Sequence, residues 1–186
     1  MFYPRLENKA YKPGNTIEAL FDAAVDSHFN MIRVWGGGQY ESDKFLELAS
    51  RKGIMLFYDF MFSDSIYPST EKFLINVEEE IKQQIRRARN YPALALWSGN
   101  NEILQGINDW GWGRNEYRED YKKLFETLIP KIIEYESPYI SYIPSSTVYG
   151  VGNYGLERGG DSHFWSVWAG GAEFESYIQN IGRFNS

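Results

Sequence analysis

Glu102 is the residue of this sequence whose surroundings best suit acid–base chemistry. It follows the run WSGNN at 97–101, and no other charged residue appears until Asp109. A carboxyl group among apolar and aromatic neighbours keeps its proton to a higher pH, because desolvation penalises the anion. Such a group can serve as the general acid that protonates a sugar leaving group. The position also suits a residue that only caps the segment after it or binds solvent, and these roles stay open.

Two further charged residues accompany runs that resemble buried strands. Asp59 ends the apolar run at 54–59, where it could bind a sugar hydroxyl or hold a neighbouring loop. Arg33 lies in the middle of the run at 31–35, with the same strand parity as Trp35. If it faces the interior it needs a carboxylate partner, since an unpaired buried charge is very costly. If it faces a helix end, its role is structural.

The two histidines lie far apart in the sequence. His28 is expected at an exposed helix end, whereas His163 lies between Asp161 and Trp165, so that the aspartate could fix its tautomer. The wide separation, the lack of an HExxH motif and the absence of cysteine argue against a zinc site. The sequence also lacks the GxSxG pattern of many Ser-His-Asp enzymes. We therefore expect no metal and no cofactor.

Aromatic residues make up 17% of the chain and include six tryptophans. Most tryptophans belong to a protein core, but those at strand ends or in glycine-flanked loops are better placed to stack on a sugar. Four meet this description: Trp35, Trp110, Trp165 and Trp168.

Hydrophobic spacing predicts the helices and strands that position these residues. The predicted helices cover residues 15–25, where Asn15 and Glu18 form a capping-box-like start, and then 42–52, 70–90, 115–129 with a further turn from Pro130 toward Glu136, and 172–180. The predicted strands cover residues 2–4, 31–35, 54–59, 93–98, 139–143 and 162–168, with the start of a seventh at 183–186.

Alternation of helices with buried strands indicates an α/β protein with a parallel sheet. Polar and aromatic residues recur at the C-terminal ends of the strands (Trp35, Asp59, Glu102 and His163), which form the active face of a (β/α)8 barrel. A complete barrel takes roughly 250 residues, so a chain of 186 is short by about a quarter. We predict an incomplete TIM barrel spanning 1–186 and truncated at both ends. A doubly wound sheet is disfavoured because no GxGxxG loop is present.

Composition narrows the range of partners. The net charge of −6 gives no electrostatic footprint for nucleic acid or an anionic membrane. No apolar run approaches the roughly 20 residues of a membrane span, and no signal peptide is recognisable, so the compartment stays open.

Four motifs resemble those of one known family. They are RVWGGG at 33–38, DFMF at 59–62, WSGNNEI at 97–103 and GDSHFW at 160–165, followed by VW at 167–168. In this order they resemble the catalytic domain of β-mannosidases of glycoside hydrolase family 2. RVWGGG and SGNNE differ from the corresponding stretches of the β-galactosidases and β-glucuronidases that share the fold.

The resemblance implies a TIM barrel that removes terminal β-linked mannose with retention of configuration. Glu102 would be the acid/base, and Asn101 would bind the sugar 2-hydroxyl. Arg33 would steady the carboxylates from within the barrel. The other implied substrate-binding residues are Trp35, Asp59, Trp110, His163 and Trp165.

A retaining enzyme also needs a nucleophilic carboxylate about 5–5.5 Å from the acid/base. In the family this residue follows an RF-x-S stretch, which here is residues 183–186, so we expect the nucleophile directly after Ser186 and the chain alone to be inactive. Two alternatives stay open: a non-catalytic carbohydrate-binding module, and a family 2 β-glycosidase of other sugar specificity. The strand edges of an unclosed barrel could also pair between copies.

Overall fold

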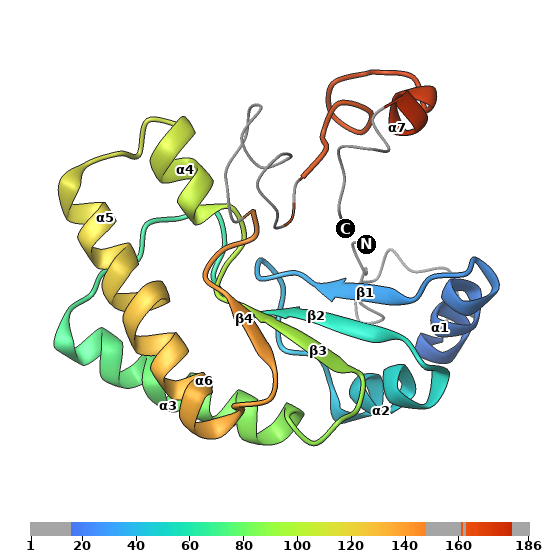
Figure 1. Cartoon of the computed structure of the whole chain (residues 1–186), viewed down its shortest axis with the longest axis horizontal. Helices are drawn as coiled ribbons and strands as arrows, with labels where there is room; N and C mark the ends of the chain where they lie inside the picture. The colour runs from blue at the N-terminus through green and yellow to red at the C-terminus, as the bar shows by residue number, and fades with distance from the viewer. Residues whose placement is uncertain (1–15, 148–160, 162, 180–186) are drawn as a thin grey trace.

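The computed structural model describes residues 16–147, 161 and 163–179. Within these residues, four strands form one parallel sheet in the order β1-β2-β3-β4 (Figure 1). They are β1 (Met31–Val34), β2 (Met55–Asp59), β3 (Leu94–Ser98) and β4 (Ser141–Ile143). The predicted α/β class and the parallel sheet are confirmed, whereas the incomplete barrel remains a prediction. The predicted strands at 2–4 and 183–186 lie outside the described residues.

Helices cover one face of this sheet (Figure 1). They include α1 (Ile17–Asp26), α2 (Asp43–Lys52), α3 (Glu71–Ala88) and α6 (Ile129–Glu136). The buried side chains Val34, Tyr58 and Trp97 belong to this face, and the Trp97 indole donates to Ser137 Oγ just after α6. In the strand registers Arg33 pairs with Phe57, so both lie on the opposite face. The guanidinium of Arg33 stands 5.1 Å from the centre of the Phe57 ring.

Helix α2 shows why these segments are helical. Ser42 Oγ accepts a hydrogen bond from the backbone N–H of Phe45 at its start, and Gly53 ends it in the left-handed region at φ 70°. Helix α1 begins in the same way with Thr16, whose hydroxyl accepts from the N–H of Ala19. Asn15, the predicted cap, lies outside the described residues.

The segment between β3 and β4 is more helical than predicted. Helix α4 (Ile103–Asp109) was missed, since its short apolar run follows directly on the strand-end motif. Helix α5 (Asn115–Tyr121) continues through the π-helical segment η1 (Lys122–Leu128) into α6. Pro130 lies in the first turn of α6, where its missing N–H is tolerated. No helix among the described residues is long and apolar enough to span a membrane.

The strand predicted at 162–168 is wrong. Residues 163–165 are irregular and 166–170 form a turn, after which comes the short helix α7 (Glu175–Gln179). The N–H groups of Ala169 and Gly170 both donate to the carbonyl of Trp165, which closes the turn. A Cβ on Gly170 would lie 2.7 Å from the Ser166 carbonyl oxygen, so the turn depends on this glycine. The glycines therefore outweigh the strand propensity of the aromatic residues before them.

Candidate active site

Glu102 lies where three chain segments meet beyond the ends of the strands. The N–H of Asn101 donates to the carbonyl of Phe62 at 2.9 Å, and the N–H of Glu102 donates to that of Ser146 at 2.6 Å. These bonds continue the parallel pairing past β2, β3 and β4. Glu102 itself has a left-handed backbone, with φ 59°. The ends of the strands thus fix the position and direction of this residue.

The side chain of Glu102 does not cap helix α4. Glu102 is the N-cap residue but makes no side-chain cap bond, whereas Asn100 Oδ1 accepts the N–H of Ile103 at 3.0 Å. Asn100 thereby satisfies the helix end. The interpretation of Glu102 as a mere cap is therefore wrong, and its carboxylate is left to face the pocket.

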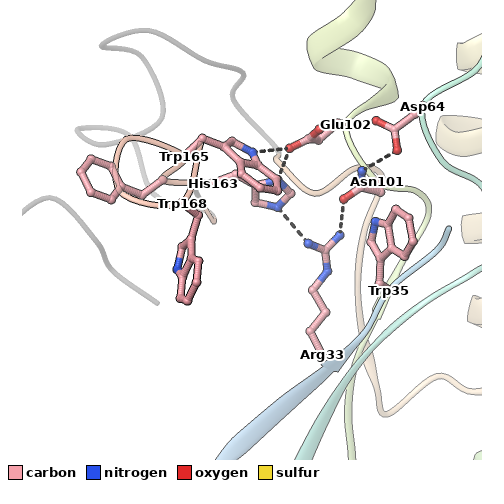
Figure 2. Close-up of a pocket in the computed structure, with 9 residues that line it drawn as sticks. Arg33, Trp35, Asp64, Asn101, Glu102, His163, Trp165 and Trp168 are labelled. Atoms are coloured by element: carbon pink, nitrogen blue, oxygen red, sulfur yellow. Dashed lines mark hydrogen bonds and ion pairs between the residues drawn. The ribbon is translucent and has the colours of Figure 1, made fainter. Parts of the chain in front are cut away.

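A cavity of about 580 Å³ opens beside Glu102 (Figure 2). Its volume lies within the range of small-molecule sites. Apolar aromatic surface dominates the wall, with a few polar groups between the rings. The lining residues are Arg33, Trp35, Asp64, Asn101, Glu102, His163, Phe164, Trp165 and Trp168.

Two ring nitrogens converge on one oxygen of Glu102. His163 Nδ1 and Trp165 Nε1 both contact Oε1, the latter at 3.2 Å (Figure 2). Burial by itself raises the pKa of Glu102. The hydrogen bond and electrostatic attraction of His163, the hydrogen bond from Trp165 and the nearby charge of Arg33 outweigh burial and lower the pKa below the usual glutamate value. The expected raised pKa is therefore wrong for this structure. A carboxylate held as an anion is suited to act as a general base.

Arg33 has the carboxylate partner that its position required. Its guanidinium donates to both oxygens of Asp59, at 2.6 and 3.2 Å, and to Asn101 Oδ1 at 3.1 Å. Asp59 is fully buried and also accepts the N–H of Gly36 at 3.0 Å. Burial raises the pKa of Asp59, while Arg33 acts in the opposite direction. Asp59 thus anchors Arg33 and a loop from behind the cavity wall.

The loop after β1 approaches the loop after β2 very closely at Gly36. A Cβ at this position would lie 2.6 Å from the carbonyl oxygen of Phe62 and 2.7 Å from that of Phe60. Only glycine fits this crossing without displacing backbone atoms. The preceding residue, Trp35, forms part of the cavity wall.

The structure brings most of the predicted site residues together at the cavity. Arg33, Trp35, Asn101, His163 and Trp165 all line it with Glu102. Two predicted residues, Asp59 and Trp110, do not line the cavity.

Asp59 is one of them, since it lies behind Arg33. The other is Trp110, which lies outside the lining residues: it is 42% exposed and packs edge-on against Trp112, with ring centres 5.3 Å apart. His28, by contrast, is exposed at a helix end, as expected.

Asp64 and Phe164 also line the cavity, and neither was among the predicted site residues. Asp64 accepts a hydrogen bond from Asn101 Nδ2 at 3.1 Å and has a left-handed backbone, with φ 46°. Its position five residues beyond the strand-ending Asp59 is the signal that could have identified it. Ser146, which contacts His163, likewise follows a strand end. No group of three potential metal ligands occurs among the described residues.

No family model matches the chain, but related proteins are found. The chain is 35% identical over 170 residues to a β-mannosidase of Mus musculus, covering 88% of this chain and 19% of that protein. It is 42% identical over 139 residues to β-mannosidase A of Aspergillus niger, covering 72% and 15%.

A solved structure shows the same relationship. The β-D-mannosidase of Dictyoglomus thermophilum is similar over 94% of this chain and 22% of its own, with 37% identity and a TM-score of 0.78. The chain thus spans about a fifth of the length of the proteins it matches.

Proposed function

The chain is related to the β-mannosidases of glycoside hydrolase family 2, and from this relationship we propose that it forms the acid/base half of a retaining β-mannosidase active site. The observation that carries the proposal is Glu102, whose carboxylate faces a cavity of about 580 Å³ with aromatic walls. Aromatic rings suit the apolar faces of a sugar, and the carboxylate suits proton transfer at its glycosidic oxygen.

Retaining hydrolysis uses such a carboxyl group twice. In the first step Glu102, carrying a proton, donates it to the departing oxygen while a second carboxylate attacks the anomeric carbon. In the second step Glu102, now an anion, takes a proton from the water that releases the sugar. The anionic state favoured by His163 and Trp165 suits this second step. The proposal assigns to Asn101, adjacent to Glu102, the binding of a hydroxyl of the same sugar.

The second carboxylate is expected to come from outside the described residues. Among those residues, Asp64 is the other carboxylate that lines the cavity, and its Oδ2 is already bound by Ser63 and Asn101. We therefore expect the chain alone not to hydrolyse an aryl β-mannoside. An experiment on catalysis must supply the rest of the enzyme.

A chimera provides this context. The chain replaces the matching segment of the Dictyoglomus thermophilum β-mannosidase, and the chimera is assayed with aryl β-mannosides of different leaving-group acidity. Glu102→Gln should lower kcat/KM about 10²–10⁴-fold for a phenyl mannoside, because proton donation is lost. The loss should be much smaller for a dinitrophenyl mannoside, whose leaving group needs no proton. Glu47→Gln, a change on the outer surface of α2, is the matched control.

Other outcomes would contradict the proposal. An active chimera in which Glu102→Gln affects both substrates equally would remove the acid/base role. Sugar binding without any hydrolysis, unaffected by Glu102→Gln, would support a carbohydrate-binding module. Faster cleavage of aryl glucosides, galactosides or glucosaminides than of mannosides would support a family 2 enzyme of other specificity.

A further inference from the structure

An unbroken series of side-chain contacts links Arg33, His163 and Glu102 (Figure 2). Arg33 Nη1 lies 2.9 Å from His163 Nε2, and the other ring nitrogen of His163, Nδ1, contacts Glu102 Oε1. His163 therefore joins a permanent cation to the proposed acid/base through opposite edges of one ring. Its protonation state must be compatible with both neighbours.

Arg33 determines which ring nitrogen of His163 carries the proton. A guanidinium only donates hydrogen bonds and is not deprotonated in proteins, so Nε2 must accept. Arg33 cannot turn away, because Asp59 and Asn101 hold its other nitrogens. A neutral imidazole with an accepting Nε2 has its hydrogen on Nδ1. That hydrogen points at Glu102, so His163 donates and Glu102 accepts as an anion.

The remaining polar neighbours of His163 are compatible with this tautomer. Ser146 Oγ lies 2.9 Å from Nε2 but donates its hydroxyl to Asp161 Oδ2, which leaves the single lone pair of Nε2 to Arg33. The Asp161 carboxylate lies 3.8 Å from Nε2 and favours a charged ring, but that ring would direct a second N–H at Arg33. Asp64 contacts Asn101 rather than His163. Asp59 is engaged with Arg33.

We propose that His163 is a positioning residue that controls the charge of Glu102: fixed by Arg33, its Nδ1–H holds the Glu102 carboxylate as an anion, and Glu102 takes up the proton needed for the first catalytic step only when this hydrogen bond is released. The inference rests on the proposed function, since it gives His163 a role in that same site. It differs from the expectation that His163 binds the sugar directly.

The tautomer of His163 is measurable without any substitution. Long-range ¹H–¹⁵N spectra of the complete ¹⁵N-labelled chain distinguish the two ring nitrogens of each histidine. The chain has two histidines, and the exposed His28 provides the internal reference. We expect His163 to be neutral at pH 7 with its hydrogen on Nδ1. A hydrogen on Nε2 alone, or a doubly protonated ring, would overturn the inference.

The effect on Glu102 is measured by following its carboxyl carbon in a pH titration, with the signal assigned from its loss in Glu102→Gln. His163→Leu removes the donor and should raise the pKa of Glu102 by about 1, as expected for the loss of a hydrogen bond to a charged group. His163→Asn keeps an N–H near the Nδ1 position and should restore most of the original value.

An unchanged pKa in His163→Leu, or an equal rise in both variants, would refute the role of the Nδ1–H. Trp165→Phe removes the second donor to the same oxygen and provides a scale for the effect. None of these measurements requires turnover. An inactive chimera would therefore count against the proposed function, whereas an unmoved pKa would count against His163 alone.

Discussion

Two glutamates of this protein have similar burial and opposite surroundings. Glu102 and Glu136 both have nearly buried side chains and lowered pKa values, and each borders a cavity, of about 580 and 570 Å³. Glu136 lies at the end of α6. Its partners are Arg86 of α3 and Arg89, the residue that follows α3. Around Glu102 they are a histidine and a tryptophan.

The partners explain why one carboxylate is structural and the other is suited to chemistry. Hydrogen bonding by Arg86 lowers the pKa of Glu136, and the paired guanidinium N–H groups hold it in one geometry. Since arginine stays charged, the two guanidinium groups hold this carboxylate as an anion at neutral pH. Around Glu102 the nearest partners are an imidazole and an indole, and neither is a permanent cation. Cavity volume and a lowered pKa are therefore insufficient evidence for an active site.

The largest difference between the two glutamates should appear in stability. Glu136→Gln removes the charge that pairs with Arg86 and Arg89, whose side chains are 55% and 38% exposed, so we expect a lower urea midpoint. Glu102→Gln should lower the midpoint less, because the glutamine amide oxygen can still accept the hydrogen bond from Trp165. Circular dichroism at pH 7 measures both midpoints. An equal decrease of the urea midpoint in the two variants would contradict the structural role assigned to Glu136 alone.

A smaller effect should appear as a dependence on pH. Because the pKa of Glu136 is lower in the folded than in the unfolded chain, its contribution to stability is present above the ordinary glutamate value of about 4.3 and is lost as the pH falls through the folded value. The difference in urea midpoint between the parent and Glu136→Gln should therefore shrink below about pH 4. A difference that stays constant down to pH 2 would exclude an ionic origin.

The smallest effect concerns the aromatic walls. Trp168 borders the cavity of Glu102, and Tyr135, which is 84% exposed, borders that of Glu136. In the chimera, Trp168→Ala should raise KM for an aryl mannoside by tenfold or less, about the value of one stacking contact. Tyr135→Ala is the matched control, with KM expected to stay at the parent value. A similar change in KM in both variants would show that Trp168 does not contact the substrate.

The sequence predicted best what depends on local pattern. The strand that ends at Asp59 and the helix between Ser42 and Gly53 follow from apolar runs, caps and a glycine stop, which act over a few residues. Arg33 was expected to pair with a carboxylate if it faced the interior, and it pairs with the buried Asp59. These features are set by neighbours in the sequence or by the high cost of an unpaired buried charge.

Features that depend on distant segments were predicted less well. The pKa of Glu102 was expected to rise because only its own neighbours in the sequence could be considered. Its decisive partners, His163 and Trp165, are 61 and 63 residues away. The strand expected at 162–168 does not form, because the glycines after it favour a turn over the strand propensity of the aromatic residues. Trp110 packs against Trp112 and does not line the cavity.

Gly36 imposes a limit on how this pocket could diversify. Because a single methyl group here would collide with two carbonyl oxygens, even alanine must push the two crossing loops apart. Trp35 is attached to one of those loops, and Asp59 holds the same loop through the N–H of Gly36. Substitutions that reshape the cavity should therefore leave the backbone on its Trp35 side in place.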